Sequence, residues 1–291
     1  MKASPPSALS EASVATTPSP QAGLNRGSAR SVLMTVLGEL VWPTGQPART
    51  SALLYVMAGL GIEEATARQA IIRGAESGWI EGEKHGREVS WSLTPYLTRV
   101  FEEGSRRVDD LSDPFPEWDS RWLVLFITVP KAQRSHRKRL YGDLTWAGFG
   151  NPAPGVWLSP HGERHVQVSE VVRRLGLAES TMSFHGPVDG VGLSEAEIVT
   201  KGWDLDSLAQ DYAEVYEEFR APQPQSPDEV LFTEVRAVGQ LQRFPFTDPQ
   251  LPAALLPDWI GRRVADHIQS LRRRWARDVT ERWAEISRGE Y

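Results

Sequence analysis

Between residues 61 and 95, cationic and hydrogen-bonding side chains recur at a spacing that places them on one face of a helix. They alternate with small apolar residues, which would turn the opposite face toward a core. Arginine and glutamine can form paired hydrogen bonds to base edges of duplex DNA, and arginine also binds phosphates. The pattern therefore predicts contacts with the major groove or its phosphate rims by Thr66, Arg68, Gln69 and Arg73.

A turn that could form a second DNA contact follows this segment. After Gly78, two short extended runs fold back around Lys84-His85-Gly86-Arg87, and the second run alternates apolar and polar residues until Pro95. That alternation is typical of a strand with one buried face. A helix followed by such a hairpin indicates the recognition helix and wing of a winged helix-turn-helix. We expect Lys84, His85 and Arg87 to meet DNA backbone or minor groove, with Arg49 as a further contact.

Two helices are predicted before the recognition helix, and they must position it. Apolar residues recur at helical spacing behind Ser28, a suitable N-cap, and this first helix should end near Trp42-Pro43. A second helix is expected after Thr50, and the recognition helix should then run from Ile62 to Ser77. Its closure by Gly78 fits a helix C-terminus.

Composition sets limits on the function. The 291 residues carry a net charge of −6, and the predicted DNA-binding segment is about neutral, so cations must gather on one face to bind phosphates. A winged helix used only for protein contacts stays open as an alternative. There is no cysteine, which excludes disulfides and thiolate metal sites and fits a reducing compartment. No apolar run approaches the roughly 20 residues of a membrane span, so we expect a cytoplasmic protein without a membrane partner.

The chain divides into five predicted parts. The first is a disordered tail over residues 1–26, rich in Ser, Pro and Ala, and the second is the DNA-binding domain over 27–101. A polar linker is predicted over 102–117. Residues 118–190 show the order strand, helix, strand, strand, helix, strand, which predicts a ferredoxin-like α/β sandwich. Residues 191–291 should form a helical C-terminal domain, which gives an α+β protein as a whole.

The helical predictions after residue 191 rest on apolar stripes and caps. One stripe runs from Leu205 to Phe219, and the carboxylates beside it are interpreted as a solvated face. Ser226-Pro227-Asp228-Glu229 is a capping box with proline at the first helical position. A last long helix should extend from Asp258 to Ser287, with two tryptophans on its seam assigned to the core.

Catalytic constellations are scarce. The chain has no GxSxG elbow, Walker loop or GxGxxG motif, so we expect no catalytic site, no resident metal and no cofactor. His161 and His165 lie four apart, but Pro160 and Gly162 favour a loop and no third metal ligand is evident. The cluster from Arg134 to Arg139 could hold the phosphates of a ligand or of DNA, or could be a solvated helix face.

The recognition segment contains Ala67-Arg68-Gln69-Ala70-Ile71-Ile72-Arg73, and the hairpin contains Gly86-Arg87-Glu88-Val89-Ser90-Trp91. These strings resemble the winged-helix domain of the family of PaaX-type transcriptional repressors of aromatic-acid catabolism. Trp122-Leu123-Val124-Leu125-Phe126 and Gly155-Val156-Trp157-Leu158-Ser159-Pro160 resemble its ferredoxin-like domain. The stretch from Phe246 to Gly261, FTDPQLPAALLPDWIG, resembles its C-terminal signature. Gly74 stands where the family usually has a large apolar residue.

The resemblance implies a homodimeric repressor that binds duplex operator DNA and leaves it when an aryl-CoA thioester, such as phenylacetyl-CoA, binds. Phosphate contacts for that effector are expected from Arg134, Arg137 and Arg139. The middle domain also resembles small CRISPR-associated metal-dependent nucleases, which hold a metal with an aspartate near the end of the first strand. Here that strand ends Phe126-Ile127-Thr128-Val129-Pro130, and Asp119 lies before it, which disfavours the nuclease alternative.

Overall fold

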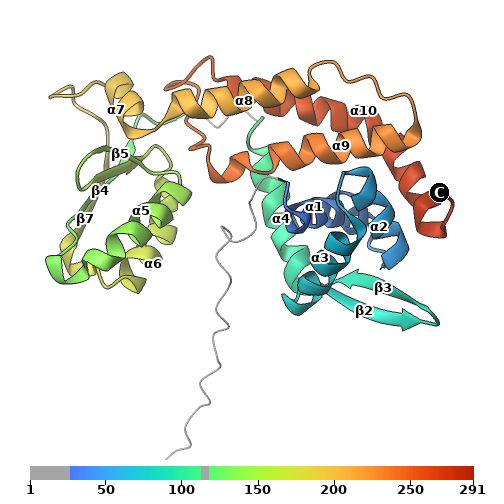
Figure 1. The fold of residues 1–291 in the computed structure, drawn as a ribbon. Helices are drawn as coiled ribbons and strands as arrows, with labels where there is room; N and C mark the ends of the chain where they lie inside the picture. Colours follow the sequence, from blue (N-terminus) through green and yellow to red (C-terminus); the bar gives the residue numbers. More distant parts are fainter. Residues whose placement is uncertain (1–26, 113–117) are drawn as a thin grey trace, which may run out of the picture.

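The computed structural model describes residues 27–112 and 118–291, so the predicted tail over residues 1–26 lies outside the described residues. Helices dominate, and two small antiparallel sheets complete a mixed α+β fold. In Figure 1, long helices run along the top, and two lobes lie below them. We name the lobes the head (residues 27–112) and the middle unit (residues 118–190), and the top layer the helical body (residues 191–291). No described helix has the length and apolar character needed to cross a bilayer.

The helices of the head begin and end at capping signals that the sequence displays. The Ser28 hydroxyl accepts a hydrogen bond from the backbone N–H of Ser31 at 3.3 Å, and Gly78 follows the third helix with a left-handed φ of +69°. The helical elements are α1 (Ala29–Val36), η2 (Leu37–Val41), η3 (Trp42–Thr44), α2 (Thr50–Gly59), α3 (Glu64–Glu76) and α4 (Pro95–Asp109).

A three-stranded sheet adjoins α3 in the order β1-β3-β2, with β1 (Ala48–Arg49), β2 (Ile80–His85) and β3 (Glu88–Leu93). The indole N–H of Trp91 donates to the Thr50 hydroxyl at 2.9 Å, and that hydroxyl donates to the Val89 carbonyl at 2.9 Å. These bonds tie the hairpin to the start of α2. The apolar side of the hairpin, formed by Val89, Trp91 and Leu93, is only half-buried.

The prediction of a linker over residues 102–117 is wrong for the first half of that segment, because α4 continues to Asp109. Thr94 caps this helix by accepting from the Leu97 N–H at 3.2 Å, and Pro95 occupies its first turn. The ion pair between exposed Glu103 and half-buried Arg107, at 3.0 Å, belongs to the run of polar residues that gave the segment its linker-like composition. Residues 113–117 lie outside the described residues.

The middle unit is a four-stranded antiparallel sheet in the order β5-β6-β4-β7. Leu123, Leu125 and Ile127 point from β4 into a core formed with two helices on that face. The strand–helix–strand–strand–helix–strand order agrees with the predicted order. The elements are β4 (Trp122–Ile127), η4 (Lys131–His136), α5 (Arg137–Trp146), β5 (Gly150–Ala153), β6 (Val156–Ser159), η5 (Gly162–Arg164), α6 (His165–Arg174), η6 (Ala178–Ser180) and β7 (Thr181–Gly186).

The helical body begins beside the middle unit and returns over the head (Figure 1). Ser194 and Glu197 form a capping box at its first helix, and Ser226 caps α9 by accepting from the Glu229 N–H at 3.2 Å. Its elements are α7 (Glu195–Gly202), α8 (Leu205–Phe219), α9 (Pro227–Leu241), η7 (Phe244–Phe246) and α10 (Ile260–Arg288). The two seam tryptophans of α10, Trp275 and Trp283, are buried, which confirms their assignment to the core.

The head and the helical body share one hydrophobic core. A single cluster contains Leu33 and Leu53 of the head together with Leu231 and Ile268 of the helical body, whereas the middle unit has a separate cluster. The predicted division between a domain over 27–101 and another over 191–291 therefore does not describe how the apolar residues pack. These two segments form one packed body, although 89 residues of sequence separate the predicted domains.

Close contacts and buried polar bonds reinforce this shared core. A Cβ on Gly59 of α2 would lie 2.1 Å from the ring of Phe232 on α9, so the absence of a side chain lets the ring pack there. Arg272 of α10 contacts two carboxylates, Glu39 at 2.8 Å and Glu234 at 3.8 Å. Burial raises the pKa of both carboxyl groups, that of Glu234 to about 8 with a further rise from Glu39.

Candidate nucleic-acid interface

The outward face of α3 presents the residues predicted to meet the major groove. Thr66, Arg68, Gln69 and Arg73 are all exposed, whereas Ala67, Ala70 and Ile71 are buried against the head. This separation of exposed and buried side chains follows from the helical period, because residues three and four positions apart lie on the same face of a helix. The exposure agrees with the predicted orientation, and contact with DNA stays a prediction.

The α3 face also contains a residue that sequence reasoning missed. Ile72 is 45% exposed, although it is apolar, and it lies one turn after Arg68 and next to Arg73. An apolar side chain at such a place can contact the methyl group of thymine. Its position among the outward residues of the helical period was the signal that could have identified it.

Arg68 is engaged in an intrahelical ion pair. Its Nε and Nη2 donate to Glu64 Oε1 at 2.9 and 2.7 Å, and both side chains are more than half exposed. An exposed pair of this i,i+4 type contributes only about 0.3–0.5 kcal/mol. The guanidinium can therefore leave Glu64 for a base or a phosphate at small cost.

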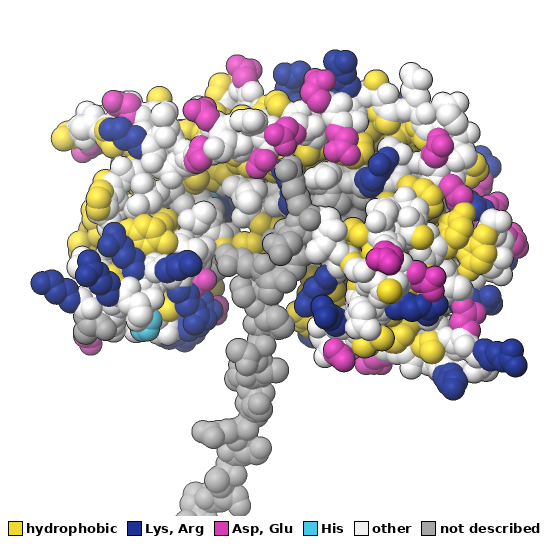
Figure 2. Space-filling view, in the orientation of Figure 1, with side chains coloured by type: hydrophobic (Ala, Val, Ile, Leu, Met, Phe, Trp, Pro, Cys, Tyr) yellow, Lys and Arg dark blue, Asp and Glu magenta, His cyan; other side chains and the backbone are white. Residues whose placement is uncertain are grey.

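The hairpin places the predicted wing residues at its tip. Lys84 and His85 end β2, Gly86 with φ +64° makes the turn, and Arg87 follows, all of them exposed. His85 Nε2 lies 3.7 Å from a Glu83 carboxylate oxygen, so the tip holds both signs of charge. Figure 2 shows cationic side chains projecting from the lower edge of the head, where the hairpin lies in Figure 1.

Arg49 lies opposite Ser90 of β3 rather than at the tip of the hairpin. Its side chain is half exposed, and its Nε lies 3.9 Å from Glu88. Glu88 also accepts a hydrogen bond from the Ser51 hydroxyl, at the start of α2. The structure thus places Arg49 next to the N-terminus of α2, on an element different from α3.

The predicted effector residues Arg134, Arg137 and Arg139 are exposed on η4 and α5 of the middle unit. Arg137 lies over the ring of Tyr141, 5.3 Å from its centroid. Figure 2 shows Lys and Arg side chains gathered over this lobe, and the cations exposed on these elements include Lys131, Lys138, Arg173 and Arg174. None of the three predicted residues lines the large cavity that the structure contains. Their role stays a prediction.

Neither histidine of the His161–His165 pair is arranged as a metal ligand. His161 Nε2 hydrogen-bonds the Gln250 carbonyl at 2.9 Å, and His165 Nδ1 contacts the Gly162 carbonyl at 3.0 Å. Asp119, the carboxylate before the first strand of the middle unit, accepts from the Arg121 N–H at 3.0 Å. Within residues 27–112 and 118–291, no three His, Asp or Glu side chains are grouped to hold a metal ion.

Three family models match successive parts of the chain. They are described as PaaX-like protein (residues 28–97), PaaX protein central Cas2-like domain (residues 116–198) and PaaX-like protein C-terminal domain (residues 203–285). Together they match most of the chain in the order of the head, the middle unit and the helical body.

Individual relatives agree with the family models. The chain is 26% identical over 250 residues to the transcriptional repressor PaaX of Escherichia coli (strain K12), covering 80% of this chain and 76% of that protein. It is also similar in fold to the solved structure of an uncharacterized protein from Mycobacterium tuberculosis, with a TM-score of 0.57 and 22% identity. That likeness covers 87% of this chain and 98% of the other.

Proposed function

The chain belongs to the PaaX family of transcriptional regulators, and from this premise we propose that it is a repressor that binds duplex operator DNA through its head. The exposed row Arg68, Gln69 and Arg73 on α3 is the observation on which this proposal rests. The helices α1, α2 and α3 followed by the hairpin β2-β3 have the order of a winged helix-turn-helix. In such a unit, α3 enters the major groove and the hairpin tip approaches the adjacent backbone or minor groove.

The middle unit supports an architecture with a ferredoxin-like sandwich. Its sheet order β5-β6-β4-β7 and its two helices on one face are those of a βαββαβ sandwich. This unit lies apart from the hairpin and α3 in Figure 1. We assign it to assembly and sensing rather than to base recognition.

We propose that the protein acts as a homodimer through the open face of that sheet. Phe126, Met182 and Phe184 are between 41 and 57% exposed on the face opposite the helices, with the two phenylalanine rings 5.9 Å apart. β7 is also an edge strand, and an apolar face beside an open edge suits a self-complementary contact. Two heads would then read an inverted repeat. Light scattering that gives a monomer at micromolar concentration would contradict the dimer.

The effector that we propose is phenylacetyl-CoA or a related aryl-CoA thioester, on the strength of family membership. Such a ligand must bind the DNA-competent and DNA-incompetent arrangements with different affinities, because equal affinities shift no equilibrium. Arg134, Arg137 and Arg139 offer exposed cations for its phosphates. Release of the protein from its operator by the thioester, but not by the free acid or free coenzyme A, is the expected behaviour.

The experiment that tests DNA binding is fluorescence anisotropy with a labelled fragment from the chain's own promoter region. The double variant Arg68→Ala/Arg73→Ala should lose about 1–3 kcal/mol for each arginine that reads a base edge. The matched control is Arg220→Ala/Arg277→Ala, which removes two exposed, ion-paired arginines from the helical body. Equal operator affinity of the two double variants, both folded, would remove the assignment of α3 as the reading element.

A further inference from the structure

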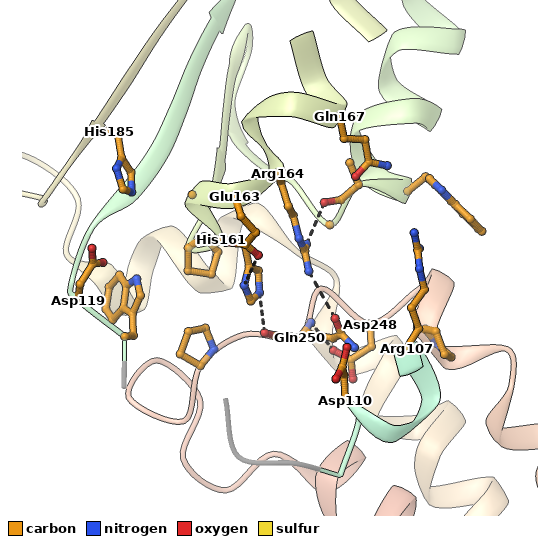
Figure 3. A pocket seen from close by; sticks show the side chains of 18 residues that line it. Arg107, Asp110, Asp119, His161, Glu163, Arg164, Gln167, His185, Asp248 and Gln250 are labelled. Carbon is orange, nitrogen blue, oxygen red and sulfur yellow. Dashed lines mark hydrogen bonds and ion pairs between the residues drawn. The ribbon is translucent and has the colours of Figure 1, made fainter. Parts of the chain in front are cut away.

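A cavity of about 810 Å³ lies where α4, the middle unit and the loop after α9 meet (Figure 3). Its size falls within the range of small-molecule sites in proteins, roughly 300–1,000 Å³. Arg107 and Asp110 line it from the end of α4, Arg164 and the residues around it from the middle unit, and Gln250 from the loop before α10. Its walls therefore come from three segments that are distant in sequence.

Arg164 reaches across this cavity toward Gln250 in Figure 3. Its guanidinium donates to the Ala147 carbonyl at 2.8 Å and to Gln250 Oε1 at 3.4 Å, which are both neutral acceptors. Within residues 27–112 and 118–291, no carboxylate oxygen lies within 4.0 Å of its nitrogens. Burial lowers the pKa of Arg164 to about 10, so the side chain keeps its positive charge at neutral pH without a counter-ion in contact.

The backbone is shaped to admit this arginine. Gly148 has a left-handed φ of +75°, and a Cβ built on it would lie 1.8 Å from Arg164 Nη1. Every other residue would therefore be strained in its backbone and would displace the guanidinium. The missing side chain at Gly148 therefore leaves the space that the Arg164 guanidinium occupies.

Gln250 supplies a second donor beside the guanidinium. It is one of two non-glycine residues with positive φ in the described part of the chain, at +57°. Its N–H donates to Asp248 Oδ1 at 2.7 Å and its carbonyl accepts from His161, while its side-chain Nε2 is buried without a hydrogen-bond partner. A buried donor without an acceptor is unfavourable unless a ligand provides one.

Four carboxylates line the cavity, those of Asp110, Asp119, Glu163 and Asp248. The charges of Glu163 and Asp248 raise the pKa of Arg164 without direct contact. Asp248 is occupied by three donors, the Tyr212 hydroxyl at 2.9 Å, the Trp259 indole N–H at 2.8 Å and the Gln250 N–H. Glu163 is mostly exposed and lies 3.6 Å from His161 Nδ1. Burial, and next the charge of Arg164, lowers the pKa of His161 to about 4, so this imidazole is neutral at pH 7.

Flat apolar side chains provide the rest of the lining. Trp146 is stacked on Phe246 with ring centroids 4.4 Å apart, and Trp118 packs edge-on against Trp122 at 5.2 Å. Both Trp146 and Trp118 line the cavity, together with Pro245 and Pro252. Such walls favour a planar or apolar ligand part, whereas Arg164 and Gln250 favour an anionic one.

We propose that this cavity binds a small organic anion, with its carboxylate or phosphate group held by Arg164 and Gln250 and its flat apolar part beside Trp146. Because the walls belong to the middle unit, the head and the helical body, the bound anion biases how the middle unit sits against the other two. This bias is the step by which the ligand alters operator affinity, and that part of the inference rests on the proposed function.

Isothermal titration calorimetry on the full chain without DNA tests the site. The probes are phenylacetyl-CoA, phenylacetate, coenzyme A and inorganic phosphate, and we expect at least one of the three organic anions to bind. Gln250→Glu places a carboxylate next to Arg164 and should weaken that binding about 10-fold or more, with an unchanged or raised melting temperature. Arg164→Gln should weaken it as well. Arg220→Gln, on the exposed surface of the helical body, is the control and should bind like the wild type.

The outcomes separate the site from the proposed function. Binding of phenylacetate alone identifies a carboxylate ligand, and binding of the thioester or coenzyme A identifies a phosphate-bearing one; either supports the site. No binding of any organic anion, or equal binding by the wild type and Gln250→Glu, overturns it, even if Arg164→Gln fails to fold. A ligand that binds without changing operator affinity overturns the coupling alone. Absence of operator binding overturns the proposed function whatever calorimetry shows.

Discussion

The head and the middle unit are attached to the helical body in different ways. The head has no core of its own, since Leu33 and Leu53 lie in one cluster with Leu231 and Ile268. The Tyr55 hydroxyl donates to Asp228 at 2.7 Å, and Arg272 bridges Glu39 of the head and Glu234 of the helical body. Apolar packing, hydrogen bonds and ion pairs thus all cross this joint.

The middle unit closes its own core and meets the helical body through a smaller contact. That contact is a separate cluster around Trp122, Ile198 and Leu251, with Trp203 packed over Gly150. The cavity lined by Arg164 and Gln250 lies at the same junction. The comparison teaches that α3 and the hairpin belong to a unit fixed to the helical body by a shared core, whereas the middle unit is joined to that body by a smaller apolar contact.

Matched core truncations should have the largest effect and test this comparison directly. Leu231 of α9 and Leu144 of α5 are both fully buried, so each change to alanine should cost about 2–5 kcal/mol. Leu231→Ala should lower the calorimetric transition of the head and helical body, and Leu144→Ala that of the middle unit. If both variants lower one common transition by similar amounts, the two attachments do not differ as we describe.

The stability of the joint between the head and the helical body should depend on pH through Glu234. Because its folded pKa is raised from about 4.5 to about 8, the folded state binds more protons between these values, and stability falls as pH rises through 8. Glu234→Gln should remove this slope and stabilise the protein at pH 8.5 by about 1 kcal/mol or more. Thermal unfolding at a series of pH values measures how stability depends on pH in each variant. Glu217→Gln on the exposed face of α8 is the control, and an unchanged slope in Glu234→Gln would refute the prediction.

A pair of glycine substitutions in the head should have the smallest effects. A Cβ on Gly74 of α3 would lie 3.4 Å from Leu33, an ordinary contact, so Gly74→Ala should stabilise the head by about 0.5–1 kcal/mol. Gly59→Ala meets the Phe232 ring at the joint instead and should destabilise it. Chemical denaturation measures the free energy of unfolding of both variants. A gain in both variants would mean that the joint is looser than the packing around Phe232 indicates.

Local signals in the sequence were sufficient for most element boundaries. Ser28 and Ser226 cap the helices that were predicted to follow them, and the hairpin turns at Gly86 within the predicted segment Lys84-His85-Gly86-Arg87. The outward orientation of Arg68 and Arg73 followed from helical period alone. Such predictions succeed because a cap or a period depends on residues within one turn or a few strand positions.

Features that depend on distant residues could not be predicted in this way. The part of α4 after residue 101 was interpreted as a linker because most of its side chains are polar, and its neighbour η7 lies more than 130 residues later. The shared core needed the pairing of Leu33 with helices beyond residue 227. The cavity likewise assembles Arg107, Arg164 and Gln250, whose spacing in the sequence has no recognisable pattern.

The shared core also has a consequence for folding during synthesis. The ribosome completes the head long before it makes α9 and α10, so Leu33 and Leu53 cannot reach their native partners until about residue 286 has emerged. The middle unit, whose core partners all lie within residues 123–177, can fold first. The head is therefore synthesised early but completes its core last, and its apolar surface must be kept from aggregating in the interval.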